Sequence, residues 1–209
     1  MTEADWLTAT DPRPMLEFLR WKASDRKLRL FAAACCRGAW DRLKYAPLRR
    51  AVEVIEQIAD GEAAHGQLAA LNKTVRKIWY ALQDDDNQTY WSVLAATDPS
   101  AIVAPGTTNR DALNMTLHVR AVPAQQRICL LRDIFNPFRP VVFDPAWRSE
   151  TVSALAAGIY AERAFDRLPI LADALEEAGC DQPDILYHCR GPGPHVRGCW
   201  AVDLVLGKS

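Results

Sequence analysis

Several features are missing from this sequence, and each absence excludes a class of protein. No apolar run approaches the roughly 20 residues that a membrane-spanning helix requires. The opening, MTEADWLTAT, is acidic and polar and therefore unlike a secretory signal. The net charge of −1 provides no overall field that would attract nucleic acid or a membrane surface. We therefore expect a soluble, cytoplasmic protein whose six cysteines stay reduced.

The common catalytic motifs and the pattern of β-strands are absent as well. The chain contains no GxSxG, no HExxH and no glycine-rich dinucleotide-binding motif. Alternation of apolar and polar residues is not sustained anywhere, and the run Val141, Val142, Phe143 is too short to build a sheet. These absences disfavour an enzyme of the familiar classes and favour an all-α fold.

The sequence does contain a dense series of helix signals. Hydrophobic residues make up 49% and charged residues 24% of the 209 residues, which is typical of a globular protein. Asp11-Pro12 and Ser24 mark helix starts, and Pro47 begins another helix that Gly61 ends. The clearest helix follows and keeps helical spacing for about five turns. Its apolar positions are Ala64, Leu68, Leu71, Val75, Ile78, Trp79 and Leu82.

Other helix boundaries are less regular but can still be predicted. Residues 24–44 are expected to form one long helix. Asp166 and Asp181 are expected to cap two helices of the C-terminal part, and Gly179 should end the first of them. The acidic run 84–86 could hold magnesium, but three adjacent carboxylates are more typical of an exposed helix end.

A proline-rich segment, NPFRPVVFDPAW, interrupts the helical pattern at residues 136–147. Proline at this density excludes regular helix and favours an extended linker. We expect an N-terminal helical domain over 1–135 and a C-terminal helical subdomain over 148–209, in an irregular bundle or array of about eight to ten helices. Trp147 is expected to anchor the linker to a helical groove.

The first candidate site is a group of cysteines and histidines near the C-terminus. Zinc is held by about four nitrogen or sulfur ligands in a tetrahedron. Cys189, His195 and Cys199 could surround one ion across the GPGP loop. Cys180 or His188 would then be the fourth ligand. The spacing lacks a paired CxxC unit, so the alternative is that the cysteines are small core residues and the histidines cap or pack.

The second candidate is the loop GPGPHVRG, which precedes a predicted helix. Glycines permit close approach of the backbone, and free N–H groups at a helix start favour an anion. His195 and Arg197 could therefore clamp a phosphate or carboxylate. Arg190 and Trp200 flank the loop and complete the candidate ligand or partner set. The alternative is a rigid turn in which Arg197 pairs with Asp203.

A third candidate is the basic stretch between residues 20 and 50. Such a patch could hold nucleic acid through its phosphates, with Arg26, Lys27 and Arg37 among the contacts. The basic residues are spread over two or three helices, however, and no helix-turn-helix spacing stands out. A solvated face is therefore favoured, and nucleic-acid binding is not expected to be the main role.

Two segments of the chain resemble a known family. The opening MTEADWLTATDPRPMLEFLRWKASDRKLRLFAAACCRGAW and the C-terminal run LPILADALEEAGCDQPDILYHCRGPGPHVRGCWAVDLVLGKS are similar to blocks of a large paralogous family of planctomycetal proteins. The resemblance covers about 1–61 and 133–209 but not 62–132. It implies no catalytic residues and at most a regulatory or interaction role. LADALEEAG also resembles the bacterial repeat-companion domain.

The adjacent thiols of Cys35 and Cys36 depart from the family pattern. The family's opening often carries an extra cysteine before this pair, where the present chain has Ala33 or Ala34. The departure weakens any metal-binding interpretation of the pair. Both cysteines lie in an apolar helical stretch, so buried free thiols are expected.

Taken together, these patterns favour a non-catalytic protein-interaction or regulatory module with a protein partner. A metal- or anion-binding protein that uses the loop region 180–199 is the alternative, with zinc as the metal. Nucleic-acid binding through the basic face 20–50 comes third. No other cofactor is expected.

Overall fold

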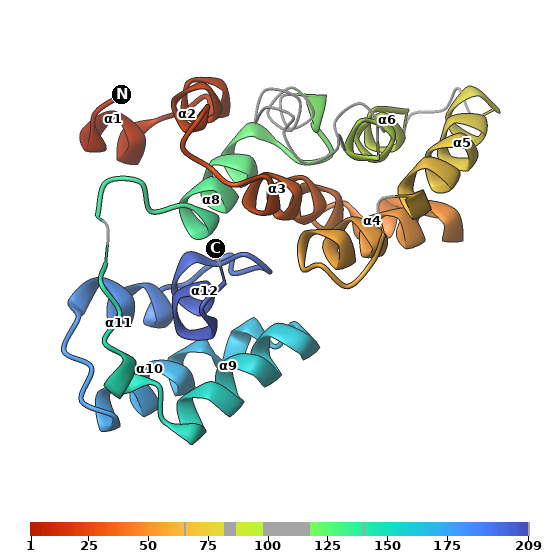
Figure 1. The fold of residues 1–209 in the computed structure, drawn as a ribbon. Coiled ribbons are helices and arrows are strands. Elements are labelled where there is room, and N and C mark those ends of the chain that lie inside the picture. The colour runs from red at the N-terminus through yellow and green to blue at the C-terminus, as the bar shows by residue number, and fades with distance from the viewer. Residues whose placement is uncertain (65, 82–86, 98–117, 140, 209) are drawn as a thin grey trace. The chain divides into compact units, whose positions relative to one another are not determined.

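The computed structural model describes residues 1–64, 66–81, 87–97, 118–139 and 141–208. Over these residues the fold is all-α, as predicted, with eleven α-helices, three short 3-10 helices and no strand (Figure 1). The acidic run 84–86 lies outside the described residues. Among the helices that are described, none is both long and apolar enough to cross a membrane. The chain divides into two compact units, Met1–Leu131 and Arg132–Ser209.

The N-terminal unit begins with a helix that the sequence patterns above do not predict. Thr2 accepts a hydrogen bond from the Asp5 backbone, and the Asp5 side chain accepts one from the Thr2 backbone. This reciprocal capping box starts α1. The described helices of this unit are α1 (Glu3–Thr8), α2 (Pro12–Leu19), α3 (Asp25–Arg37), η1 (Trp40–Arg42), α4 (Ala46–Ala59), α5 (Gly66–Ala81), α6 (Asn87–Ala96) and most of α8 (Ala124–Ile134).

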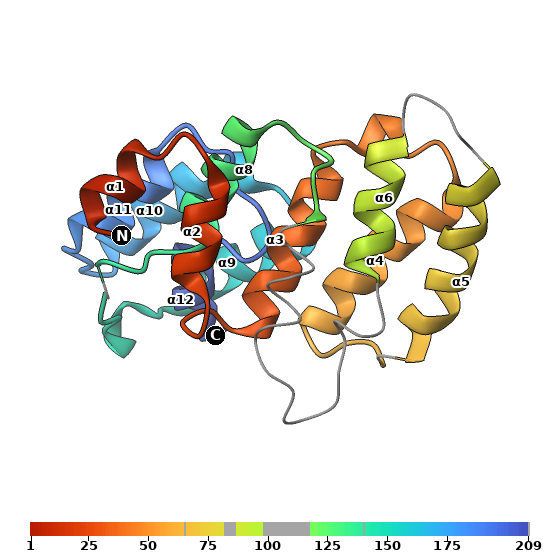
Figure 2. The ribbon, with the colours of Figure 1, turned by 90° about the horizontal axis from the view of Figure 1, so that it is seen from above.

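Helix α3 is buried along most of its length in the N-terminal unit. Every residue from Leu28 to Cys36 is buried, as expected of a helix packed on several sides. Helices α4 and α6 both pack against α3 (Figure 2). Cys35 and Cys36 are fully buried free thiols, as predicted, and burial raises the pKa of Cys36 to about 12.

Helix α3 ends earlier than predicted, at a glycine on which other residues pack closely. The expected single helix over 24–44 stops at Gly38, after which the short helix η1 begins. A Cβ atom at position 38 would lie 2.7 Å from both Gln126 and Val122. A larger residue at position 38 would displace these two side chains, so glycine allows their close packing at the end of α3.

The C-terminal unit consists of four α-helices and the linker that precedes them. Its helices are η3 (Pro145–Trp147), α9 (Glu150–Glu162), η4 (Phe165–Arg167), α10 (Leu168–Glu177), α11 (Pro183–Arg190) and α12 (Trp200–Leu206). Helix α9 packs on α10 and α12, and α10 packs on α11. The buried core that they share is Val152, Ala156, Ile159, Tyr160, Leu168, Leu171, Ala172, Ala174, Leu175, Cys180, Ile185, Leu186, Cys189, Cys199, Ala201, Val202 and Val205.

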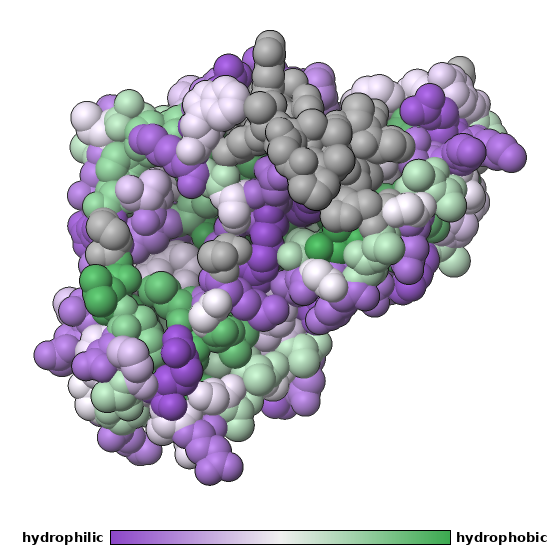
Figure 3. Space-filling model, viewed as in Figure 1, coloured by the Kyte–Doolittle hydropathy of each residue, from purple (hydrophilic) through white to green (hydrophobic). Residues whose placement is uncertain are grey.

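The linker lies against this core. Trp147 packs on the buried cluster, as predicted, and stacks edge to face on Phe143 with 5.5 Å between ring centroids. Arg148 donates hydrogen bonds to the carbonyls of Val205 at 2.7 Å and Leu204 at 3.1 Å. These bonds satisfy the last carbonyls of α12. Hydrophobic residues remain visible along the linker in Figure 3, and Val142 is 83% exposed.

Two predicted helix caps of the C-terminal unit are wrong. Asp166 does not cap α10 because it lies inside η4, and Arg167 takes the cap position without a side-chain bond. Asp181 does not cap α11, since the helix starts at Pro183 with Gln182 before it. In both places a proline in the first turn fixes the helix start, and no acidic cap is needed. Gly179 follows α10 with φ of +87°, as predicted.

The N-cap residue of α9, Ser149, allows a test of how much helix capping contributes to the stability of the C-terminal unit. The Ser149 side chain accepts a hydrogen bond from the Val152 backbone at 3.2 Å. We expect Ser149→Ala to lower the free energy of unfolding by about 1 kcal/mol, because this N–H then loses its partner. Urea denaturation measures the change. Thr151→Ala, on the exposed side of the same helix, is the control and should change it by under about 0.5 kcal/mol.

Candidate metal centre

Four side chains of the C-terminal unit meet at one point, and each comes from a different local structure. Asp133 lies at the end of α8, which stops before the Asn136-Pro137 pair because proline disfavours helix in the residue before it. His188 lies in the last turn of α11. His195 lies in the loop after α11, and Cys199 is the residue that caps α12. One donor atom from each of the four residues lies within 4.8 Å of the others.

The contacts within this cluster are short. The Asp133 Oδ1 atom lies 2.6 Å from His195 Nδ1 and 3.2 Å from His188 Nε2. The His188 Nε2 atom lies 3.1 Å from Cys199 Sγ. Tetrahedral ligands at zinc bond lengths are separated by roughly 3.3–3.8 Å. The ligand atoms therefore need to move by about an ångström or less to surround an ion.

His195 and Asp133 form a buried ion pair. His195 Nδ1 faces the Asp133 carboxylate, and His195 Nε2 faces the Gly191 carbonyl at 3.3 Å. Both partners are acceptors, so both ring nitrogens carry protons. Burial lowers the pKa of His195, but the hydrogen bond to Asp133 and its charge outweigh burial and raise that pKa above its usual value. Burial raises the pKa of Asp133, and the two histidines outweigh it in turn and lower that pKa.

The same contacts suit metal binding by His195 and Asp133. A metal-bound histidine ordinarily donates its second N–H to a carbonyl or carboxylate, as His195 Nε2 does to Gly191. The second oxygen of Asp133 accepts the backbone N–H of Val196 at 3.0 Å. An ion that replaced the proton on His195 Nδ1 would leave both of these supporting bonds intact.

Cys199 is a buried thiol at the same point. Burial raises its pKa well above the usual value, and the charge of Asp133 adds to the increase. Hydrogen bonds from the backbone of Val202 and Ala201 lower the pKa of this thiol and so partly offset the increase. In the metal-free protein the raised pKa therefore keeps the side chain a thiol, even though the His195 imidazolium is near. A metal ion would stabilise the thiolate, which the two backbone donors already suit.

His188 is held by a different partner from His195. The indole N–H of Trp200 donates to His188 Nδ1 at 3.1 Å. An indole nitrogen can only donate, so His188 Nδ1 carries a lone pair and the proton resides on Nε2. That N–H faces Asp133 Oδ1 and Cys199 Sγ. His188 therefore stands in the cluster as a neutral hydrogen-bond donor.

The sequence-based metal candidates are only partly brought together. His188, His195 and Cys199 meet, whereas Cys180 and Cys189 lie in the hydrophobic core of the unit and outside the cluster. Cys189 follows His188 on α11 and so points about 100° away from it. Asp133 was not among the candidates, because 62 residues separate it from His195 and no spacing rule links them.

The arginines proposed for an anion site do not converge on the loop. Arg197 donates to the carbonyls of Tyr160 at 3.2 Å and Ala161 at 3.4 Å, near the end of α9. Arg190 forms ion pairs with Asp173 and Glu176 of α10. Both arginines thus bind groups of the C-terminal unit itself.

Two of the basic residues proposed to bind nucleic acid form ion pairs within the N-terminal unit. Arg26 forms an ion pair with Asp60 at 3.1 Å, and Arg37 forms one with the buried Glu56 at 2.9 Å. Lys27 follows the Ser24 cap in the first turn of α3, where its backbone N–H donates to the Ser24 side chain. Two of the three proposed phosphate contacts are therefore committed to carboxylates of this unit.

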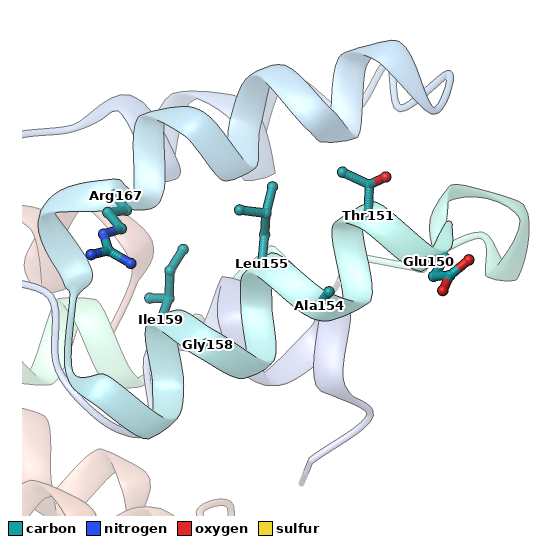
Figure 4. Close-up of a pocket in the computed structure, with 7 residues that line it drawn as sticks. All are labelled: Glu150, Thr151, Ala154, Leu155, Gly158, Ile159 and Arg167. Carbon is teal, nitrogen blue, oxygen red and sulfur yellow. The ribbon is translucent and has the colours of Figure 1, made fainter.

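An open groove on the C-terminal unit lies apart from the cluster. Thr151, Leu155 and Ile159 point from α9 toward α10, with Glu150 near one end and Arg167 near the other (Figure 4). Ala154 and Gly158 complete the lining. None of these residues belongs to the cluster around Asp133, so the groove and the cluster are separate features.

The chemistry of the described residues is thus concentrated in the cluster of Asp133, His188, His195 and Cys199. Its donor atoms are one oxygen, two nitrogens and one sulfur. Comparisons of the chain with models of protein families, with curated proteins and with solved structures find no match.

Proposed function

We propose that the C-terminal unit is a zinc-binding module in which Asp133, His195 and Cys199 hold the ion. The observation that supports this most directly is the convergence of four donor atoms within 4.8 Å of one another. Two of the residues already have the supporting hydrogen bonds that metal ligands need. His188 lies beside these ligands, with its Nε2 atom near Asp133 Oδ1 and Cys199 Sγ.

The charge and type of the donors favour zinc over other ions. Asp133 and a Cys199 thiolate contribute two negative charges, and His195 without its Nδ1 proton is neutral. A divalent ion therefore makes the buried site neutral overall, which avoids the cost of an unpaired buried charge. Sulfur and imidazole ligands suit zinc, whereas magnesium and calcium prefer oxygen.

The proposed ion would connect parts of the C-terminal unit that are distant in sequence. It joins the end of α8 to the loop after α11 and to the start of α12. The loop has no regular secondary structure between Gly191 and Cys199, and the ion would add a cross-link to the bonds that His195, Val196 and Arg197 already make. The function of the ion is therefore structural at least, and metal binding contributes directly to folding.

Thermal unfolding with and without zinc tests this proposal. At a free zinc concentration about 100 times the dissociation constant, bound zinc raises the free energy of unfolding by about 2.7 kcal/mol. We expect the melting temperature of the C-terminal unit to rise by about 10 °C. Cys199→Ser should abolish the increase. A chain that binds no zinc at micromolar concentration, or a Cys199→Ser variant that responds like wild type, would refute the proposal.

Cys180→Ser is the matched control. Cys180 is buried in the same unit, but it lies outside the cluster. We expect this variant to lose some stability without zinc and to keep the full zinc-dependent increase in melting temperature. Equal loss of the zinc response in both cysteine variants would mean that the metal binds elsewhere.

A further inference from the structure

We propose that the bound metal keeps one exchangeable coordination position, which takes a small anion hydrogen-bonded by His188. The inference rests on the proposed zinc site and adds a ligand class to it. In this arrangement Asp133, His195 and Cys199 are the protein ligands. His188 is a positioning residue that stays uncoordinated and offers its Nε2 proton to the exchangeable ligand.

The contact with Trp200 supports this assignment of His188. Coordination through Nε2 requires a lone pair on that atom and places the proton of a neutral ring on Nδ1. The Nδ1 atom, however, already accepts the Trp200 indole N–H at 3.1 Å. Two donors would then face each other, so ligation costs His188 its bond to Trp200. His195 has no such conflict, because its second nitrogen faces a carbonyl.

His188 lies beside the position that the ion would take and is the most exposed of the four residues. Its Nε2 atom lies within 3.2 Å of both Asp133 Oδ1 and Cys199 Sγ, so its N–H lies beside the position that the ion would take and within reach of a ligand bound there. The His188 side chain is 17% exposed, compared with 9% for His195 and 3% for Asp133. Cys199 is fully buried. Of the four residues, His188 therefore has the side chain with the most contact with solvent.

Because His188 donates a hydrogen bond, the exchangeable ligand that it stabilises is expected to be an anion. An N–H donor beside an open metal position stabilises a ligand atom that carries negative charge and a free lone pair. Three protein ligands with a fourth exchangeable position are the usual arrangement of zinc sites that bind small molecules. Small anions fit this position, whereas cations and purely apolar ligands do not.

The test uses the full chain loaded with Co²⁺, whose visible absorption reports coordination, and azide as the anionic probe. In wild type we expect azide to change the spectrum in a saturable way. His188→Leu should keep Co²⁺ affinity within about tenfold, while azide affinity falls by about tenfold because one charge-assisted hydrogen bond is lost. His188→Gln keeps an N–H donor and should recover part of the azide affinity.

Trp200→Phe distinguishes positioning from simple packing. Without the indole N–H, Nδ1 of His188 is free to take the proton and Nε2 can bind the metal. We expect Co²⁺ affinity to increase while the azide response decreases, since His188 now fills the fourth position. Damage to the fold would lower both quantities together.

The two proposals fail in different ways. If wild type binds neither Zn²⁺ nor Co²⁺, the metal site itself is refuted. If wild type binds Co²⁺ but His188→Leu lowers Co²⁺ affinity by more than about 100-fold, which exceeds the usual cost of losing a residue outside the ligand set, the exchangeable position is refuted and the zinc site stands. A wild-type spectrum that azide leaves unchanged leads to the same conclusion.

Discussion

Replacing Asp133 with asparagine is expected to remove the metal and to destabilise the metal-free protein. Metal affinity should fall by at least about 100-fold, because an amide is a poor replacement for an anionic ligand. Without metal, the buried His195 imidazolium loses its counter-charge. Breaking a buried ion pair in this way costs about 3 kcal/mol.

The pH dependence of this loss follows from the two shifted pKa values. The pKa of His195 is raised, so its contribution is complete below the ordinary histidine value of about 6.5 and disappears as pH rises through the raised value. The pKa of Asp133 is lowered, so its contribution is present above about pH 3.9 and is lost as pH falls through the lowered value. The stability difference between wild type and Asp133→Asn should be largest between about pH 4 and 6.5.

Urea denaturation of the metal-free proteins across this pH range measures the difference. Asp184→Asn is the matched control, because Asp184 forms an exposed ion pair with Arg139 in the same unit. Exposed pairs are worth under about 1 kcal/mol, so the control should change little at any pH. A constant difference for Asp133→Asn over the whole range would contradict the ion-pair account.

Metal affinity itself is expected to increase steeply with pH. The metal must displace the His195 Nδ1 proton and the Cys199 thiol proton, and both groups have raised pKa values. Below both values the release of two protons raises the apparent affinity by about 100-fold per pH unit. Competition with a calibrated chelator between about pH 5.5 and 6.5 measures this slope.

Substitution of Cys199 shows how much of this pH dependence comes from the thiol proton and how much from the His195 proton. Cys199→Ser removes the thiol, so any residual binding should follow a slope of about tenfold per pH unit. Cys180→Ser again serves as the control and should keep the full slope. An affinity that does not change with pH would show that neither His195 nor Cys199 gives up a proton on binding.

The sequence predicts most of the fold because helix signals are local. The Asp11 and Ser24 caps, the prolines at helix starts and Gly179 all depend on residues within one turn. The wrong Asp166 and Asp181 caps are local errors too, because a proline in the first turn sets each helix start, whereas the length of α3 involves distant residues. The helix expected over 24–44 stops at Gly38, on which Val122 and Gln126 pack, and nothing near Gly38 in the sequence reveals that packing.

The candidate site is predictable in part for the same reason. His188, His195 and Cys199 are near one another in sequence, and their grouping is visible there. Asp133 joins them only because the fold returns to the end of α8, and the linker between carries no ligand signal. The role of Trp200 likewise depends on a side-chain direction that spacing alone does not specify. The protein-interaction role that the sequence favours stays a prediction.

The zinc content of the purified chain after dialysis against dilute zinc tests the central claim most directly. Elemental analysis should find one zinc ion per wild-type chain, and close to none in Asp133→Asn and Cys199→Ser under the same conditions. Cys180→Ser should match wild type. Absence of zinc from the wild-type chain, or equal zinc in wild type and in both ligand variants, would contradict the account.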